Sequence, residues 1–306
     1  MIHSQPPVNL HFLVPGFSKC GTTTLCDLLA EHPQLFMPTG DKKEPRFFGN
    51  PDFEQDWSTY KEFFSDASQG ALLGEGSTNY SGVNVGELAR ERILRLYPHI
   101  KLIFIARDPI DRIESSYREF HHNGTKFGHP APFHLYEALE KFPQMLEDSR
   151  FLTRINNYRD HMSANQILII FLEDLKAKPN EVLAQCFEFL GVDPTVRITH
   201  PRRQLNSRRQ KLHDTEQLRL MRQYRHNPET SRSLRKLSLD LQDQFLEPLG
   251  LRQRFTKAPL EWDQESIDQV MNALRDEIPV FLETFGKPLD FWPRFTQTMT
   301  TAKGHS

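Results

Sequence analysis

Apolar and polar positions follow one another along the first part of the chain in an order that predicts strands and helices in turn. The stretches 12–14, 101–106 and 166–172, which are apolar throughout apart from the first residues Lys101 and Gln166, are typical of strands buried on both faces of a parallel sheet. Shorter runs at 34–37 and 71–75 predict two further strands. This order predicts an α/β fold with a mostly parallel central sheet and helices on both faces. The segments with helical spacing are 25–29, 57–64, 87–97, 109–121, 134–140, 150–162 and 180–190.

The pattern changes in the last third of the chain. From Arg197 the sequence is basic and mostly helical, and Pro248 and Pro259 interrupt it. A last helix is predicted over 267–285, and the polar tail from Thr296 is expected to fray. The change indicates an extra helical segment attached to the α/β core.

The first predicted strand leads into a loop of small residues and then a helix. Such a turn presents backbone N–H groups and a helix N-terminus to a phosphate. Gly16 and Gly21 have the spacing of the Walker A motif, but Thr22 stands where that motif has its lysine, and Lys19 lies inside the loop instead. The loop Ser18-Lys-Cys-Gly-Thr-Thr-Thr24 therefore indicates phosphate binding and argues against ordinary ATP chemistry.

A second phosphate motif follows the strand at 101–106. The stretch Arg107-Asp-Pro-Ile-Asp-Arg-Ile-Glu-Ser115 combines a guanidinium with a hydroxyl near a helix start, which suits a phosphate monoester. In parallel sheets the ligand site lies at the carboxyl ends of the strands. We therefore expect the loops that carry Lys19, Glu44, Glu75 and Arg107 to converge.

These two motifs together resemble those of sulfotransferases. The Lys19 loop resembles the family's 5′-phosphosulfate loop, and residues 107–115 resemble its 3′-phosphate motif. The resemblance extends to about Gly191 and returns at 276–292; in its motifs the chain is most similar to heparan-type, other carbohydrate and bacterial sulfotransferases. It implies a sulfotransferase fold like that of P-loop NTPases, the donor 3′-phosphoadenosine 5′-phosphosulfate (PAPS), in-line transfer of the sulfuryl group and no metal.

The resemblance also implies roles for individual residues. Lys19 would stabilise the leaving phosphate, while the start of the following helix holds the 5′-phosphate. Arg107 and Ser115 would hold the 3′-phosphate. The predicted donor-binding residues are Ser18, Lys19, Cys20, Gly21, Thr22, Thr23, Thr24, Arg107 and Ser115, with Arg208, Arg209 and Lys211 as candidates from the basic loop at 200–211.

Two groups are candidates for the base that removes the acceptor proton. The turn Lys43-Glu-Pro-Arg-Phe-Phe48 resembles a segment of heparan-type sulfotransferases whose glutamate has this role, which implies Glu44 as the catalytic base. His121, with His122 beside it at the end of the helix after Arg107, is the rival catalytic residue.

The acceptor is less well defined than the donor. Heparan-type relatives often carry a lysine directly after the glutamate that corresponds to Glu75, and here that position is Gly76. A lysine there would help to hold an anionic sugar and the sulfuryl group. Its absence favours a small acceptor, such as a specialised metabolite from natural-product biosynthesis, with a hydroxyl or nitrogen nucleophile. A saccharide or polysaccharide acceptor is the alternative.

Composition narrows the class of protein only slightly. The net charge of −2 gives no general case for nucleic-acid binding or for an anionic membrane. The three cysteines fit neither a disulfide framework nor a zinc site. The N-terminus shows no secretory signal and no window is apolar enough for a membrane span, so a cytoplasmic protein is expected.

We expect one domain over 1–306, with its core at about 8–210 and 263–295 and a helical insertion at about 211–262. The insertion is a candidate for a lid over the acceptor or for a homodimer contact. Two other functions remain open at this point. A P-loop kinase would bind ATP with Mg²⁺, and an inactive nucleotide-binding protein would bind without turnover.

Overall fold

The computed structural model describes residues 6–123, 130–198, 211–218, 244–255, 260 and 262–303. The chain divides into two compact units. The first unit comprises 1–112, 146–205 and 270–306, and the second comprises 113–145 and 206–269. Each unit is described by itself below.

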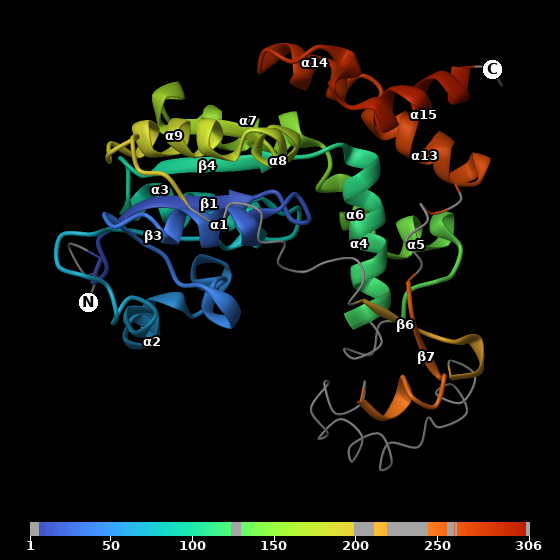
Figure 1. Ribbon diagram of the computed structural model, residues 1–306, viewed down its shortest axis with the longest axis horizontal. Helices are drawn as coiled ribbons and strands as arrows, with labels where there is room; N and C mark the ends of the chain where they lie inside the picture. Colours follow the sequence, from blue (N-terminus) through green and yellow to red (C-terminus); the bar gives the residue numbers. More distant parts are fainter. Residues whose placement is uncertain are drawn as a thin grey trace. The chain divides into compact units, whose positions relative to one another are not determined.

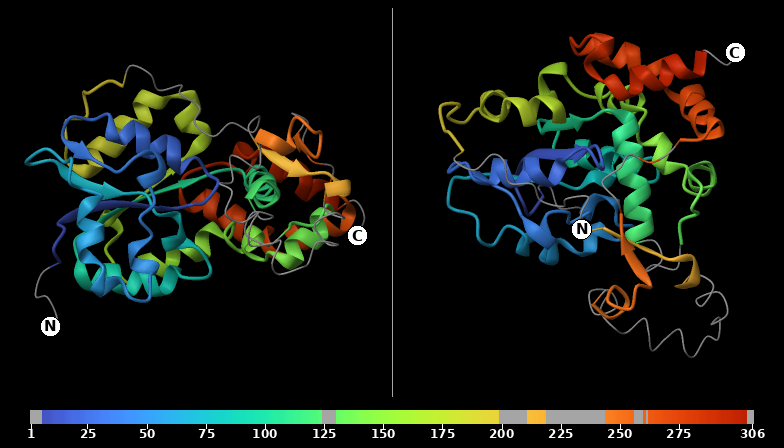
Figure 2. Two further views of the ribbon diagram at one scale, coloured as in Figure 1. Left: turned by 90° about the horizontal axis from the view of Figure 1, so that it is seen from below. Right: turned by 45° about the vertical axis from the view of Figure 1, so that its right-hand side comes forward.

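The first unit is built on a parallel sheet of five strands in the order β2-β3-β1-β4-β5. The central strands are almost wholly buried because their side chains are apolar on both faces, as the apolar stretches predicted. Helices lie on both faces of this sheet (Figure 2). The strands are β1 (Leu10–Gly16), β2 (Leu35–Phe36), β3 (Leu72–Glu75), β4 (Lys101–Ala106) and β5 (Ile167–Phe171).

Helices connect the strands in the predicted order, and β4 leads directly into α4 (Figure 1). Three helices belong partly to both units: α4 (Pro109–Asn123), α6 (Gln144–Glu147) and α13 (Gln264–Leu274). The helices that lie wholly in the first unit are α1 (Thr22–Ala30), α2 (Trp57–Glu62), α3 (Gly86–Leu96), α7 (Phe151–Arg159), α8 (Leu172–Ala177), α9 (Pro179–Leu190), α14 (Glu277–Thr284) and α15 (Pro293–Lys303). Single turns of 3₁₀ helix occur at Gly40–Lys42, Phe47–Gly49, Phe53–Gln55, Thr78–Ser81, Ala164–Gln166 and Leu289–Phe291.

The C-terminal region differs from the sequence-based expectation in two ways. The single helix predicted over 267–285 is two helices, α13 and α14. The tail expected to fray from Thr296 is instead helix α15 as far as Lys303. Its start is fixed by the Asp108 side chain, whose Oδ2 accepts hydrogen bonds from two backbone N–H groups at 3.1 and 3.2 Å. This cap comes from a residue far away in the sequence, so local composition could not predict it.

The second unit contains two short antiparallel strands, β6 (Leu212–Asp214) and β7 (Arg252–Arg254), and helix α5 (Leu135–Lys141). The sequence predicted a mostly helical insertion and missed both strands. A buried ion pair joins them, with Arg252 Nε 3.0 Å from Asp214 Oδ1. Residues 219–243 lie outside the described residues.

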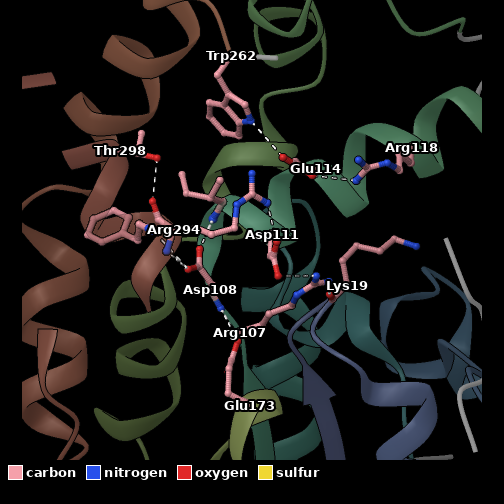
Figure 3. A network of polar contacts seen from close by, with 12 residues as sticks. Lys19, Arg107, Asp108, Asp111, Glu114, Arg118, Glu173, Trp262, Arg294 and Thr298 are labelled. Atoms are coloured by element: carbon pink, nitrogen blue, oxygen red, sulfur yellow. Dashed lines mark hydrogen bonds and ion pairs between the residues drawn. The ribbon is translucent and has the colours of Figure 1, made fainter. Parts of the chain in front are cut away.

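A buried polar group also lies on the α4 part of the second unit. Glu114 is fully buried and pairs with Arg118 at 3.0 Å, and the indole Nε1 of Trp262 lies 3.3 Å from the same carboxylate (Figure 3).

None of the helices in the described ranges is both long enough and apolar enough to cross a membrane.

Candidate active site

Side chains from four strand ends of the first unit contact one another at the carboxyl edge of the sheet. Lys43 Nζ lies 3.2 Å from Thr22 Oγ1, which joins the turn after β2 to the start of α1. Arg107, directly after β4, donates from Nη1 to the backbone carbonyl of Lys19 at 3.3 Å. Thr78, from the loop after β3, donates to Glu44 at 3.3 Å. The predicted convergence of these loops is therefore confirmed within the first unit.

The Lys19 loop has a backbone shape suited to an anion. Lys19 and Gly21 have positive φ values of +66° and +96°. Loops with such φ values can form a concave row of backbone N–H groups that binds anions. Glycine suits position 21 because a φ of +96° strains any other residue, and a Cβ there would also lie 2.6 Å from Leu172 Cδ1. The N-terminus of α1 has no side-chain cap and no acidic residue in its first turn. The positive end of this helix is therefore available to a phosphate.

Cys20 is a packing residue of this loop. Its thiol is completely buried, and burial raises its pKa to about 12 although Arg112 and Arg107 oppose the change. A thiol with so high a pKa carries almost no thiolate at neutral pH. Its predicted place in the donor loop stays a prediction, and a reactive-thiol role is not supported.

Arg107 is buried between the donor loop and α4. Its Nη2 pairs with Asp111 Oδ2 at 3.0 Å, and the other oxygen of Asp111 pairs with Arg294 Nη1 at 2.6 Å (Figure 3). Its Nε is buried and has no hydrogen-bond partner among the described residues. A buried guanidinium with a spare donor beside a phosphate-type loop fits an additional anionic ligand.

Glu44 lies beside two cations. Lys43 Nζ is 2.9 Å from its carboxylate and Arg46 Nη2 is 3.2 Å away. Burial by itself would raise the pKa of Glu44, but the charges and hydrogen bonds of Lys43 and Arg46 outweigh it and hold the pKa below its ordinary value. Glu44 is therefore ionised at neutral pH, in the form that can accept a proton.

A buried carboxyl group behind Glu44 holds the turn in place. Glu75 is fully buried and accepts hydrogen bonds from Tyr60 at 3.1 Å, from Tyr80 at 2.7 Å and from Ser77. Ser77 in turn accepts the backbone N–H of Arg46 at 2.8 Å. Sequence reasoning placed Glu75 at the strand end but missed this positioning role, because the tyrosines are brought in by folding.

The Glu75→Gln variant should be more stable than the wild-type protein at pH 8 and nearly equal to it at pH 5. Burial raises the pKa of Glu75 to about 7 from 4.5, although hydrogen bonds from Ser77, Tyr80 and Tyr60 oppose the change. A raised folded-state pKa means that the stabilising effect of the proton is present below pH 4.5 and is lost as pH rises through 7. The neutral amide avoids this loss, which is on the order of 3 kcal/mol.

Denaturant unfolding of both proteins at pH 5 and pH 8 measures the effect. Glu62→Gln is the matched control, because Glu62 is exposed on α2 and should show no such difference. A wild-type protein that loses no stability relative to Glu75→Gln over this pH range would contradict the assigned pKa.

His121, the rival base, lies in the second unit and is almost fully buried. Its Nε2 is 3.0 Å from the carbonyl oxygen of Pro132, so this nitrogen acts as a hydrogen-bond donor. Its ring packs against Tyr117 and Phe255 with centroid distances of 4.3 and 5.7 Å. His122 accepts the backbone N–H of Leu212 on Nδ1 at 3.2 Å. The contacts of His121 are those of a core residue, whereas His122 is only half-buried.

Two of the remaining predicted donor residues also lie in the second unit. Lys211 pairs with Glu119 at 2.7 Å, and its Nζ is 3.5 Å from the backbone carbonyl of Ser115. Ser115 is half-buried on α4. Arg208 and Arg209 lie outside the described residues, so their predicted contact remains untested. In the described part of the chain, no three His, Cys, Asp or Glu residues are grouped as a metal site would require.

Comparison with known proteins shows the family of this chain. Residues 10–240 match the family described as the sulfotransferase domain, which is more than half of the chain. The chain is 30% identical over 199 residues to bifunctional heparan sulfate N-deacetylase/N-sulfotransferase 3 of Mus musculus, covering 60% of this chain and 22% of that protein. The corresponding Homo sapiens protein gives the same identity and coverage. The chain thus spans about a fifth of the length of these relatives.

The solved structure of a sulfotransferase from Alicyclobacillus acidocaldarius has the same fold. It aligns with a TM-score of 0.54 at 23% identity, covering 65% of this chain and 87% of that one. The family match and the fold therefore define a protein of the P-loop-like sulfotransferase class. The chain belongs to the sulfotransferase domain family, whose members are PAPS-dependent enzymes.

Proposed function

We propose that this protein transfers the sulfuryl group of PAPS to a hydroxyl or amino nitrogen. The observation that carries the proposal is the hydrogen bond from Arg107 Nη1 to the carbonyl of Lys19. It joins the predicted 3′-phosphate motif to the predicted 5′-phosphosulfate loop, beside a helix N-terminus without a cap of its own. A nucleotide with phosphates on both the 3′ and the 5′ position of its ribose fits such a pair of anion sites.

The reaction would be an in-line displacement at sulfur. The acceptor atom forms a bond to sulfur while the bond from sulfur to the 5′-phosphate oxygen breaks, and the electron pair stays on the leaving nucleotide. Lys19 and the N–H groups at the start of α1 stabilise this developing negative charge. The acceptor proton passes to a carboxylate. Catalysis therefore consists of positioning and electrostatic stabilisation.

Glu44 is the base that the geometry supports better. It is ionised, and 23% of its side chain is exposed. Lys43 contacts both its carboxylate and Thr22 of the predicted donor loop. His121 uses Nε2 on the Pro132 carbonyl and is buried among aromatic rings. The roles of both residues remain predictions until they are tested by mutation.

For the acceptor, the small-molecule hypothesis and the saccharide hypothesis both remain. Gly76 supports the first because no lysine stands after Glu75. The heparan sulfate enzymes among the relatives support the second. A cytoplasmic location, a homodimer and a lid formed by 211–262 also remain predictions.

Addition of 3′-phosphoadenosine 5′-phosphate (PAP) without Mg²⁺ should raise the melting temperature by several degrees. Binding at a ligand concentration about 100 times the Kd stabilises the folded state by about 2.7 kcal/mol. Adenosine 5′-phosphate should have a much smaller effect, because it lacks the phosphate that Arg107 would hold.

Stabilisation by ATP with Mg²⁺ but not by PAP would instead favour the kinase hypothesis. PAP stabilisation without PAPS turnover on any acceptor of a panel of phenols, amines and amino-sugar oligosaccharides would favour the inactive binding protein.

A further inference from the structure

A buried lysine stands between the donor loop and the candidate base, and sequence reasoning gave it no role. Lys43 has only 5% of its side chain exposed. Its ammonium lies 3.2 Å from Thr22 Oγ1, on the first residue of α1, and 2.9 Å from the Glu44 carboxylate. We propose that Lys43 binds the oxygens of the transferring sulfuryl group and thereby holds the donor's reacting end against Glu44. This inference rests on the proposed function.

Electrostatics make the position of this ammonium informative. The N-terminus of α1 carries the positive end of the helix dipole, so a cation there is unfavourable by itself. No acidic residue in the first turn of α1 offsets it. Glu44 supplies one negative charge on one side. A further anion at the helix start would be attracted both by the backbone and by Lys43, which is the arrangement of an anion-binding site.

Hydrogen-bond capacity points in the same direction. An ammonium group has three donors, and the described residues accept two of them, through Thr22 and Glu44. Thr22 is itself one of the residues predicted to bind the donor. One nitrogen can therefore contact a donor group bound at Thr22 and, at the same time, the Glu44 carboxylate. A sulfuryl group that passes from donor to acceptor needs a contact at this place.

The backbone at Gly76 packs directly against Lys43 and helps to hold it in place. A Cβ at position 76 would lie 2.5 Å from Cys26 Sγ and 3.6 Å from Lys43 Cγ. The Gly76 N–H also donates to the Lys43 carbonyl at 3.3 Å. The Lys43 stem thus packs in ordinary contact with position 76, while a Cβ there would be too close to the Cys26 sulfur.

The test compares binding of PAPS and of PAP to Lys43→Met by calorimetry in the absence of any acceptor. PAP lacks the sulfuryl group, so loss of a contact to that group should weaken PAPS binding about tenfold more than PAP binding, as expected for a charge-assisted hydrogen bond. A merely structural role would weaken both ligands equally. Lys42→Met is the matched control, because Lys42 is exposed on the same turn and should bind both ligands like the wild-type protein.

Lys43→Arg should restore most of the preference for PAPS, because it keeps the charge. Lys43→Gln removes the charge but keeps a donor for Thr22, and it replaces the methionine variant if that variant does not fold. Equal loss for both nucleotides, or an unchanged ratio of the two Kd values in the charge-free variants, overturns the inference alone. Failure of the wild-type protein to bind either nucleotide overturns the proposed function and the inference with it.

Discussion

Lys19→Met should lower kcat for sulfuryl transfer by about 10²- to 10³-fold, the effect of removing one preorganised donor to a developing negative charge. Methionine keeps an apolar stem that ends at the position of the lysine Cε, and it removes the ammonium group with its charge and its hydrogen-bond donors. PAP affinity should fall much less, because the backbone N–H groups at the start of α1 and the Arg107 side chain remain. Initial rates of PAP formation from PAPS, with an acceptor identified in the panel, measure the loss.

Lys61→Met is the control for this variant, since Lys61 is exposed on α2. A Lys19→Met protein that keeps the wild-type kcat but binds PAPS weakly would show that Lys19 contributes uniform binding. That result would remove Lys19 from the chemical step.

Glu44→Gln should lower kcat by about 10²- to 10⁴-fold, the range for loss of a general base. The amide keeps the shape of the side chain, and its oxygen can still accept the hydrogen bond from the Thr78 hydroxyl. In the wild-type protein the base must be deprotonated, so activity falls as pH drops through its pKa. Lys43 and Arg46 hold that pKa below its ordinary value, so this fall should occur at a lower pH than for a free glutamate.

The pH–rate profiles of both proteins check this prediction. Glu44→Gln should lose the acidic limb that belongs to the base, and Glu31→Gln, at an exposed position after α1, should keep it. His121→Gln provides the opposing test. Activity that survives Glu44→Gln and disappears in a folded His121→Gln protein would assign the base to the histidine.

Most of the core fold could be predicted because its signals are local. The apolar run at 101–106 matches β4, and the helix predicted over 180–190 is α9, which begins one residue earlier. The donor loop was recognisable because strand, loop and helix follow one another within one short stretch. The failures lie where a distant residue decides the structure. α15 is capped by Asp108, and β6 pairs with β7 across 37 residues of chain.

The sequence by itself determined the class of protein, and it predicted the donor loop, because a phosphate site of this kind is made by consecutive residues. It also identified Arg107 and Glu44 as candidates. Only the tertiary structure decided what these residues touch. The buried Glu75 carboxyl group, which accepts hydrogen bonds from two tyrosines, helps to hold the turn that carries Glu44. The Lys43 side chain packs beside Gly76 and reaches Thr22. Such contacts join residues that are far apart in the chain, and their energies depend on burial and distance, which residue order alone does not contain.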